Sequence, residues 1–422
     1  MVELLKLPRD FRRSCIRDSI IDSIDFAFRQ NDPELKVLNF LKERIDPECG
    51  RRLRVVGFGK AGKGMYEGVK RYFGERISSA KIIVPMPDDG RLVGPFLPGD
   101  HPLPSVNTLK SSETLVTSVK GLTSDDVVLV LISGGGSSLF ELLRDDTDLE
   151  SYNRTISCMM KSGADITELN AIRYLFSKTK GGGFLNYTYP ARVIGIIVSD
   201  VPGDAEEVVA SGPTSTPPES SSIDQVVARY GQQCSIQNRR VKYETREYRA
   251  ENYVVLKNSD FVKSVSQKLE IGGFRVVSLG SRIEGNTETV ARFLVNKMKS
   301  VYERERVPVF VVGGGETSTR LTGMGIGGRN LELSLRVLLL MGDEEDFAFA
   351  SIGTDGMDGT SKAMGGVVDS KTLNILDRNY IRDSLSTSDS LEPLVQSGDV
   401  LFTGFTGTNV ADIFISYYAG SK

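Results

Sequence analysis

The stretch VVLVLISGGGSS, residues 127–138, decides the fold of this chain. Its first six residues are all apolar, which is typical of a strand that is buried on both faces of a sheet. The SGGGSS segment that follows is typical of a turn from a strand into a helix. The same alternation of apolar run, Gly-, Ser- or Asp-rich loop and helical stretch recurs along the chain, and it predicts an α/β fold with a parallel sheet.

Further apolar runs extend this pattern in both directions. Besides residues 127–132, the predicted strands are 53–56, 82–84, 193–198, 253–256, 307–312 and 347–352. Before them, Ile16, Ile20, Ile24 and Phe28 recur every four residues and predict an opening helix. A second helix is expected at 34–45.

Five of the predicted strands lead at once into loops of unusual composition. These loops are GFGKAGKG (57–64), SGGGSS (133–138), SDVPGD (199–204), GGGETS (313–318) and GTDGMDG (353–359). In an open α/β sheet the ligand lies beyond the carboxyl ends of the strands, where backbone N–H groups point at it. One such loop is an ordinary tight turn, but five at the same end of the strands predict a binding site.

Length and composition indicate the organisation of the chain. Its 422 residues are enough for two or three domains. A Pro- and Ser-rich stretch followed by a charged segment predicts a boundary between about 215 and 252, so we expect domains at 1–245 and 246–422. Charges near the N-terminus and the short apolar runs predict a protein of the cytoplasm, with no membrane partner.

Several classes of chemistry are disfavoured by composition. The net charge of −3, with Lys and Arg spread along the chain, argues against nucleic acid as a partner. The four cysteines form no CxxC pair, and we expect reduced thiols at Cys15, Cys49, Cys158 and Cys234. A single histidine, His101, excludes an HExxH zinc site.

The loop GFGKAGKG matches parts of two phosphate-binding motifs. As GxGxxG it has the glycines of a dinucleotide site, but the acidic residues that should hold a ribose, Asp88 and Asp89, come somewhat late. As GxxxxGK[ST] it has Lys63 but carries Gly64 in place of the hydroxyl residue. Both interpretations leave a backbone nest for phosphate beside Lys60 and Lys63.

Other loops offer ligands for an anion or a cation. SGGGSS presents consecutive N–H groups and two hydroxyls at a helix start. Asp200 and Asp204 flank one Pro-Gly turn, and Asp355 and Asp358 flank another, so each pair could bind Mg²⁺ or a substrate hydroxyl. Arg329 follows closely spaced glycines, and its guanidinium suits phosphate or carboxylate, with a surface salt bridge as the alternative.

Taken in order, these motifs resemble the glycerate 2-kinase family of the MOFRL type, over about residues 53–415. The resemblance rests on GFGKAGKG, GDHPLP (99–104), SGGGSS, ELNAIRYLFSKTKGG (168–182), SDVPGD, GGETS, GIGGRNLEL (325–333), GTDGMDG, GGVVD (365–369) and TGTNVADI (406–413). It implies a larger Rossmann-like N-terminal domain with a mostly parallel sheet and a smaller MOFRL-like C-terminal α/β domain, with the active site in the cleft between them. Packing of the last strands back on the first domain stays open.

The resemblance also implies an activity. Enzymes of this kind transfer the γ-phosphoryl of ATP to a hydroxyl of D-glycerate, usually at C2, and use Mg²⁺ or another divalent cation. Lys60 and Arg329 match the family's catalytic cations, and the match of SDVPGD puts Asp200 and Asp204 beside the phosphates and the metal.

A working mechanism assigns roles to these residues. Asp200 would orient or deprotonate the hydroxyl, and Asp204, with Asp355, would hold the metal. Substrate contacts are expected from His101, Lys60, Arg329 and Asp355. The phosphate-binding set is Gly134, Gly135, Gly136, Ser137, Ser138, Gly203 and Asp204.

Two other functions remain open from the sequence. The GxGxxG match favours an NAD(P)H-dependent hydroxypyruvate reductase, although hydride transfer does not need the two aspartate loops. A nucleotide-sensing module without turnover is the second. The sequence predicts only small molecules as partners and leaves the oligomeric state open, a homo-oligomer included.

Overall fold

The structure is a computed structural model that describes residues 14–87, 90–216, 220–236 and 246–421. The chain divides into two compact units. The first unit is Pro33–Leu256, and the second unit joins the N-terminal segment up to Asp32 with the chain from Lys257 onward. This division differs from the predicted domains 1–245 and 246–422, since the opening helix groups with the C-terminal part of the chain.

The opening helix α1 (Cys15–Gln30) is held in the second unit by packing and by buried charge. The ring of Phe28 lies edge-on to that of Phe261, with centroids 5.1 Å apart. The fully buried guanidinium of Arg17 makes ion pairs of 3.2 Å with Asp369 and 2.7 Å with Asp399. Sequence periodicity predicted the helix but could not predict these partners, which lie more than 300 residues away.

The first unit contains a six-stranded sheet. Its strands are β1 (Leu53–Phe58), β2 (Ile77–Pro85), β3 (Phe96–Gly99), β4 (Val127–Ser133), β5 (Arg192–Val198) and β6 (Ala250–Leu256). They lie in the order β3-β2-β1-β4-β5-β6, and every neighbouring pair is parallel. The predicted parallel sheet is confirmed, and β1, β4 and β5 are adjacent, so the turns that follow them lie at one edge.

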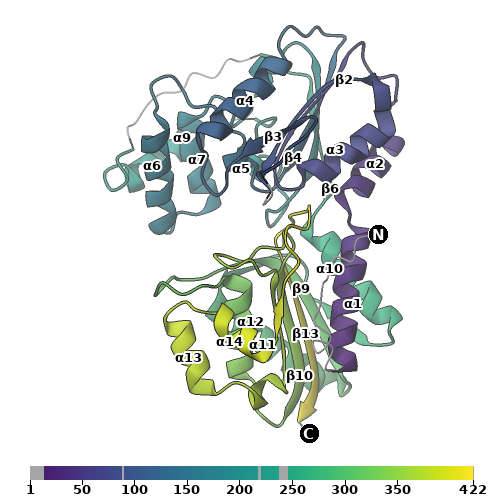
Figure 1. Ribbon diagram of the computed structural model, residues 1–422, viewed down its shortest axis with the longest axis vertical. Helices are drawn as coiled ribbons and strands as arrows, with labels where there is room; N and C mark the ends of the chain where they lie inside the picture. The colour runs from purple at the N-terminus through teal and green to yellow at the C-terminus, as the bar shows by residue number, and fades with distance from the viewer. Residues whose placement is uncertain (1–13, 88–89, 217–219, 237–245, 422) are drawn as a thin grey trace. The chain divides into compact units, whose positions relative to one another are not determined.

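Helices surround this sheet. They are α2 (Pro33–Arg44), α3 (Gly62–Phe73), α4 (Val106–Ser118), α5 (Gly136–Leu139), α6 (Leu149–Lys161), α7 (Ile166–Phe176), α8 (Leu185–Thr188) and α9 (Ser220–Tyr230), with short 3₁₀ turns η2 (Gly74–Arg76) and η3 (Val209–Ser211). In Figure 1, α2 and α3 lie on one side of the sheet and α4 on the other. β4 is buried along its whole length, as its unbroken apolar run predicts.

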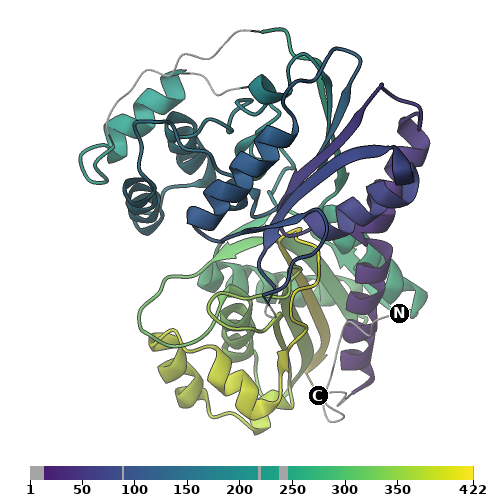
Figure 2. The ribbon, with the colours of Figure 1, turned by 45° about the horizontal axis from the view of Figure 1, so that its top comes forward.

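Three helices, α6, α7 and α9, form a separate hydrophobic cluster beside the sheet, and they lie to one side of it in Figure 2 as well. A disulfide joins Cys158 of α6 to Cys234, just after α9. The prediction of four reduced thiols is therefore wrong for this pair, while Cys15 and Cys49 are free. Spacing could not reveal the pair, because 76 residues separate the two cysteines and the fold alone brings their Cα atoms to 5.6 Å.

The second unit contains a mixed sheet. Its strands are β7 (Arg275–Ser278), β8 (Ile283–Asn286), β9 (Val309–Ser318), β10 (Glu345–Gly353), β11 (Gly365–Asp369), β12 (Val400–Leu401) and β13 (Asp412–Ser421). Their order is β12-β11-β10-β13-β9-β7, and β8 pairs with β9. Because β13 is antiparallel to both β9 and β10, the strands β9 and β10 run in the same direction. The final strand thus pairs within the second sheet.

The second unit also contains helices and a 3₁₀ turn. In its described residues these are α1, α10 (Asn258–Ile271), α11 (Thr287–Glu305), α12 (Arg329–Leu340), α13 (Arg378–Ser386), α14 (Leu391–Ser397) and the turn η4 (Thr372–Asn374). Figure 1 shows α1 and α10 on one face of the sheet and α11 and α12 on the other. None of the helices in the described part of the chain is long and apolar enough to span a bilayer.

One predicted loop is a strand in the structure. GGGETS (313–318) forms the second half of β9, where it pairs with β13 and β8. Its glycines allow close packing: a Cβ on Gly314 would lie 1.9 Å from Oδ1 of Asn258, and one on Gly315 would lie 2.1 Å from the carbonyl oxygen of Ile283. Composition suggested a loop because glycine is common in loops, but here it makes room for neighbouring atoms.

Candidate functional site

The turn between β1 and α3 is bonded to the turn after β4. Lys60 donates its backbone N–H to the carbonyl oxygen of Gly134 at 2.9 Å, and Ala61 donates to Oγ of Ser133 at 3.1 Å. Gly59 has a φ of 125°, and a Cβ there would lie 2.1 Å from Oγ of Ser133. Only glycine fits this approach, so the GFGKAGKG and SGGGSS turns form one surface at the edge of the parallel sheet.

Lys60 and His101 meet at Gly135 in the centre of this surface. A Cβ on Gly135 would lie 3.3 Å from Cδ2 of His101 and 3.4 Å from Cγ and Cε of Lys60. Gly135 itself is left-handed, with a φ of 80°, and begins the short helix α5. Two residues chosen from distant motifs therefore share one neighbour, although their chemical roles remain predictions.

A buried lysine contacts the backbone of the SGGGSS turn, which is called the glycine turn below. Lys180, only 1% exposed, donates from Nζ to the carbonyl oxygen of Phe140 and, at 3.4 Å, to that of Gly136. Both acceptors belong to the turn of α5. Burial lowers the pKa of Lys180 to about 8, and the charge of Glu141 opposes this shift.

Beside Lys180 lies a compact buried cluster in which cations outnumber acids. The carboxylate of Glu141 is fully buried and accepts hydrogen bonds from the hydroxyls of Tyr152, at 2.9 Å, and Ser177. Burial raises the pKa of Tyr152 well above its ordinary value. Arg173, 9% exposed, adds a second cation. The cluster next to the SGGGSS turn therefore contains two positive charges, on Lys180 and Arg173, and one carboxylate, on Glu141. This excess of positive charge favours an anion bound at the turn.

A chain of polar side chains connects the turn to Arg173. Oγ of Ser137 and Oγ of Ser211 lie 2.9 Å apart, and Ser211 donates to Oδ1 of Asn170 at 2.8 Å. The same oxygen accepts from Arg173 at 3.0 Å. Ser211 holds a left-handed φ of 63°, a strained conformation for a residue with a side chain.

Sequence reasoning did not select Asn170, Arg173, Lys180 or Ser211 as site residues. The first three belong to ELNAIRYLFSKTKGG (168–182), in which the apolar run from Ala171 to Phe176 is interrupted by Arg173. For Asn170 and Arg173, the signal that could have found them is their position among the apolar residues of a predicted buried helix, since buried polar groups need partners.

The SDVPGD loop follows β5, the strand next to β4. It turns sharply: Asp204 donates its backbone N–H to the carbonyl oxygen of Val201 at 3.1 Å, and both Gly203 and Asp204 have positive φ. This places the loop at the same sheet edge as SGGGSS. The roles given to Asp200, Gly203 and Asp204 remain predictions.

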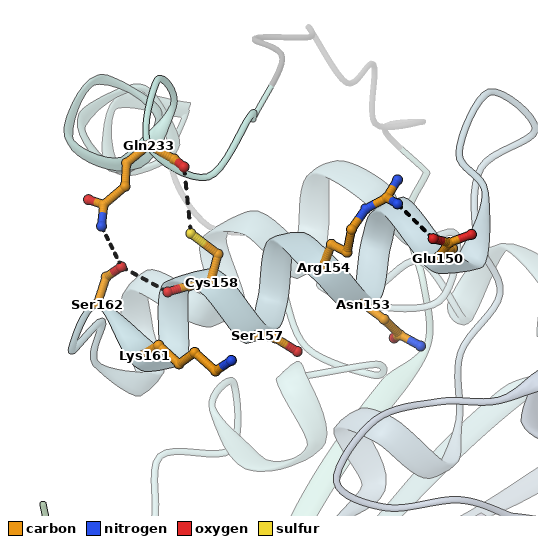
Figure 3. Close-up of a pocket in the computed structure, with 8 residues that line it drawn as sticks. All are labelled: Glu150, Asn153, Arg154, Ser157, Cys158, Lys161, Ser162 and Gln233. Carbon is orange, nitrogen blue, oxygen red and sulfur yellow. Dashed lines mark hydrogen bonds and ion pairs between the residues drawn. The ribbon is translucent and has the colours of Figure 1, made fainter. Parts of the chain in front are cut away.

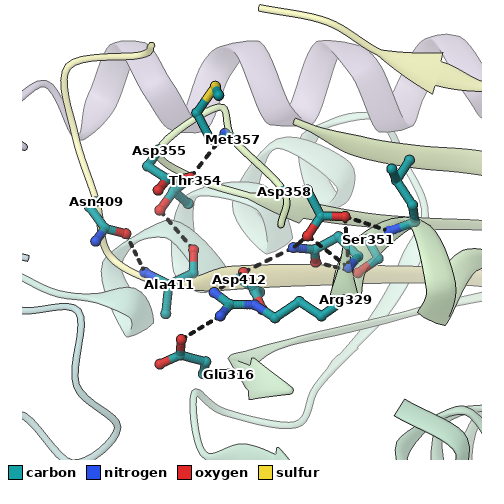
Figure 4. A network of polar contacts seen from close by, with 12 residues as sticks. Glu316, Arg329, Ser351, Thr354, Asp355, Met357, Asp358, Asn409, Ala411 and Asp412 are labelled. Carbon is teal, nitrogen blue, oxygen red and sulfur yellow. Dashed lines mark hydrogen bonds and ion pairs between the residues drawn. The ribbon is translucent and has the colours of Figure 1, made fainter. Parts of the chain in front are cut away.

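Arg329 begins helix α12 at the matching edge of the second sheet. Because β9 and β10 run parallel to each other and antiparallel to β13, the ends of the first two and the start of the third lie together. Figure 4 shows the resulting network around Arg329. Nε and Nη2 bond the two carboxylate oxygens of Asp412 at 2.7 and 3.0 Å, and Nη1 bonds Glu316 at 2.5 Å.

The electrostatics of this network differ from those of the glycine turn. Burial opposes the charge on Arg329, but Asp412 and Glu316 offset that effect and raise its pKa. Burial raises the pKa of Asp412 in turn. Arg329 thus has two acidic partners within the protein. The ion pair with Glu316 matches the surface salt bridge that the sequence left open as an alternative, whereas the ion pair with Asp412 is buried.

Asp358 has a structural role at the start of α12. It is 1% exposed, and its carboxylate accepts the backbone N–H groups of Asn330 and Leu331 at the start of α12. Burial raises its pKa to about 6. Asp358 therefore caps α12 from a neighbouring loop, and the ligand role suggested for the pair of Asp355 and Asp358 stays a prediction.

Asp355 lies in the same loop with a different orientation. One of its carboxylate oxygens accepts the backbone N–H of Met357 at 3.1 Å, and its side chain is partly exposed. The loop is braced by Thr354, which donates to the carbonyl oxygen of Ala411 and accepts from the N–H of Val410. Asp355 is thus better placed than Asp358 for a ligand, and its role stays a prediction.

The predicted residues fall into two groups, one in each unit. Lys60, His101, the SGGGSS turn, Asp200 and Asp204 belong to the first unit, and Arg329 and Asp355 belong to the second. Within the described residues, no group of three or more His, Cys, Asp or Glu side chains forms a metal site. The ribose candidates Asp88 and Asp89 lie outside the described residues.

A surface hollow over α6 lies apart from these groups (Figure 3). It is lined by Glu150, Asn153, Arg154, Ser157, Cys158, Lys161, Ser162 and Gln233. Its arginine is already paired with Glu150 at 2.7 Å, and none of the predicted site residues lines it. We therefore do not assign it to the candidate site.

Comparison with known proteins identifies the family. The model of a domain of unknown function, DUF4147, matches residues 20–243, and the MOFRL family model matches 309–412. The glycerate 2-kinase of Picrophilus torridus is 36% identical over 95% of this chain and 96% of its own length. The D-glycerate 2-kinase of Thermotoga maritima is 35% identical over 86% of this chain and 90% of its own length.

A solved structure agrees with these relatives. The crystal structure of glycerate kinase from Thermotoga maritima matches with a TM-score of 0.81 at 30% identity, and the match covers 96% of this chain and 99% of that one. The described fold, the two family models and the relatives all lead to one conclusion: the chain belongs to the glycerate kinase family of the MOFRL type.

Proposed function

We propose that this protein is an ATP-dependent glycerate kinase that transfers the γ-phosphoryl group of ATP to the C2 hydroxyl of D-glycerate, giving 2-phosphoglycerate and ADP. The observation that carries the proposal is the meeting of Lys60 and His101 at Gly135, on glycine turns at the carboxyl edge of a parallel sheet. The names of the relatives support the same substrate.

Phosphoryl transfer requires positioning and charge compensation more than covalent chemistry. The hydroxyl oxygen of glycerate forms a bond to the γ-phosphorus while the bond from that phosphorus to the bridging β–γ oxygen breaks, and the hydroxyl proton leaves. In our proposal Lys60 and Arg329 compensate the charge of the transferring group. Asp200 orients the hydroxyl and accepts its proton.

The SGGGSS turn supplies a cradle for an anionic group. Two buried cations, Lys180 and Arg173, lie beneath it with a single carboxylate, Glu141, which supports anion binding at Gly134–Ser138. The group bound there is either a nucleotide phosphate or the carboxylate of glycerate. In our proposal His101, whose ring lies near Gly135, contacts the same group.

Magnesium fits the available residues as a nucleotide-bound ion. Mg²⁺ is usually held by one or two carboxylates together with substrate phosphates and water, so a dedicated protein cage is not required. Asp204 and Asp355 are the proposed carboxylates, both on loops that follow strands. When bound, the ion would neutralise charge on the β- and γ-phosphate oxygens.

The test is a transfer assay with ATP, Mg²⁺ and D-glycerate, with the product followed by ³¹P NMR. A phosphate resonance coupled to the C2 proton is expected. Coupling to the C3 protons would shift the assignment to C3, and the absence of any phosphoglycerate would reject the kinase.

A parallel assay separates the reductase. The protein is incubated with NADH and hydroxypyruvate, and loss of the nicotinamide absorbance is recorded. We expect none. Binding of ATP with no product from any small hydroxy acid would instead favour a sensor. Since ATP and glycerate are metabolites of the cell interior, we propose the cytoplasm as the site of action.

A further inference from the structure

Arg329 has two acidic partners that differ sharply in how they are held. Asp412 is fully buried and contacts the guanidinium at two points, 2.7 and 3.0 Å. It also accepts a hydrogen bond from Nδ2 of Asn330 at 3.1 Å. Glu316 contacts Arg329 at one point, 2.5 Å, and 45% of its side chain is exposed.

This difference decides which partner can leave. Releasing Asp412 would leave a buried carboxylate without its cation, which proteins strongly disfavour. Releasing Glu316 returns an exposed carboxylate to water, and exposed pairs contribute little to stability. Of the two, only the contact with Glu316 can be exchanged at low cost.

A ligand can reach the guanidinium on the side of Glu316. The Arg329 side chain is 32% exposed, and Glu316 lies at the end of β9, whose outward face is open there. Guanidinium binds a phosphate group through two parallel N–H···O bonds, which a single carboxylate contact cannot match.

We infer that Glu316 is an exchangeable partner of Arg329. Glu316 binds the guanidinium in the unliganded protein and is displaced by a phosphate group. Asp412 stays bound and keeps the guanidinium oriented. This inference rests on the proposed function only in taking phosphate as the ligand. Glu316 therefore competes with the ligand for the guanidinium of Arg329. It favours ligands that carry more than one negative charge over simple carboxylates.

The test measures binding, so that it does not depend on turnover. Isothermal titration with inorganic phosphate and with ADP is carried out on the full chain and on three variants, Glu316→Gln, Glu284→Gln and Asp412→Asn. Glu284 is the matched control because it pairs in register with Glu316 on β8 and is also exposed. Within the described part of the chain, the guanidinium of Arg329 donates its hydrogen bonds to Asp412 and Glu316 and not to Glu284.

Glu316→Gln is expected to bind phosphate about two- to fivefold more tightly, the range that corresponds to loss of an exposed ion pair. Glu284→Gln removes the same charge without the contact with Arg329, so its effect on phosphate binding should be smaller than that of Glu316→Gln. Asp412→Asn is expected to weaken binding.

Unchanged or weaker phosphate binding by Glu316→Gln would overturn the inference, as would equal effects of Glu316→Gln and Glu284→Gln. If Asp412→Asn does not fold, the two glutamate variants still decide the question. Acetate serves as the monovalent competitor and should bind detectably only in Glu316→Gln. A wild-type protein without kinase activity that nevertheless shows this ranking would reject the proposed function and retain the inference.

Discussion

The two regions that carry the candidate cations have opposite charge balance. Beneath the SGGGSS turn, Lys180 and Arg173 face one carboxylate, Glu141, and the lysine bonds backbone carbonyl oxygens. Around Arg329, by contrast, one guanidinium is surrounded by acidic side chains, with Asp412 and Glu316 in direct contact and Asp358 nearby.

In the proposed function, the two regions bind a phosphorylated substrate in different ways. The first region lowers the energy of an incoming anion with buried positive charge and fixed N–H groups. The second region orients a cation with a buried acid and lets the ligand compete for it.

The largest effect is expected for the buried acid of the second region. Asp412→Asn leaves Arg329 without its two-point partner in a buried setting, and we expect the free energy of unfolding to fall by about 3–5 kcal/mol. Urea unfolding followed by circular dichroism measures it. Glu316→Gln is the control and should cost at most about 1 kcal/mol. Equal losses would mean that the two acids do not differ as their burial indicates.

In the first region, Lys60→Met is expected to lower kcat by about 10²–10³, since it removes a cation from the transferring phosphoryl group. Steady-state kinetics with ATP and D-glycerate provide the measurement. Lys70→Met, in the exposed last turn of α3, should leave kcat within about twofold. Near-normal turnover of Lys60→Met would remove this lysine from the catalytic residues.

Lys180 offers a pH test of the buried charge. Burial lowers its pKa from 10.5 to about 8, so between these values the unfolded chain binds more protons than the folded one. Stability linked to this group is therefore reduced below pH 8 and recovers as the pH rises to 10.5, by about 3 kcal/mol in total.

The comparison is made with Lys180→Met, which cannot titrate at this position. The free energy of unfolding of the wild type minus that of the variant should rise with pH across this window. A flat difference would show that the ammonium is not buried as the structure has it.

The smallest effect concerns the polar chain that leads to the glycine turn. Ser211→Ala removes the bonds to Ser137 and Asn170, and we expect a loss of about 1 kcal/mol in stability with a few-fold weaker binding of ADP. Ser111→Ala, which removes a bond of 2.7 Å to the carbonyl oxygen of Pro98, should lose similar stability and keep its ADP affinity. Equal ADP affinities for the two variants would separate the polar chain from binding.

Much of the first unit could be predicted from sequence because its signals are local. Unbroken apolar runs such as that of β4 predict buried parallel strands, and the glycine loops after them mark the sheet edge where ligands bind. Lys60 comes from such a loop, and His101 from the GDHPLP segment that forms part of the family resemblance. That they share Gly135 as a neighbour could not be predicted, because the contact joins three separate turns.

Errors occurred where composition and tertiary packing conflict. The composition of GGGETS predicts a loop, yet its glycines allow Asn258 and Ile283 to lie against the backbone of β9. The flanking position of Asp358 in its turn gave no sign that it caps α12. Cys158 and Cys234 were expected to be free. In each case the deciding partner is distant in sequence, so no local pattern could contain it.

Local patterns in the sequence were enough for the α/β class, for the strands β1, β2, β4, β5, β6, β9 and β10, for four of the five loops that follow predicted strands, and for the family resemblance, because periodicity and motifs are properties of short segments. Only the tertiary structure decided which charges are buried and with which partners: Lys180 with backbone carbonyl oxygens, Arg17 with two aspartates, and Arg329 between a buried acid and an exposed one. The physical reason is that burial and pairing depend on atoms from distant segments, whose distances are set only when the chain has folded.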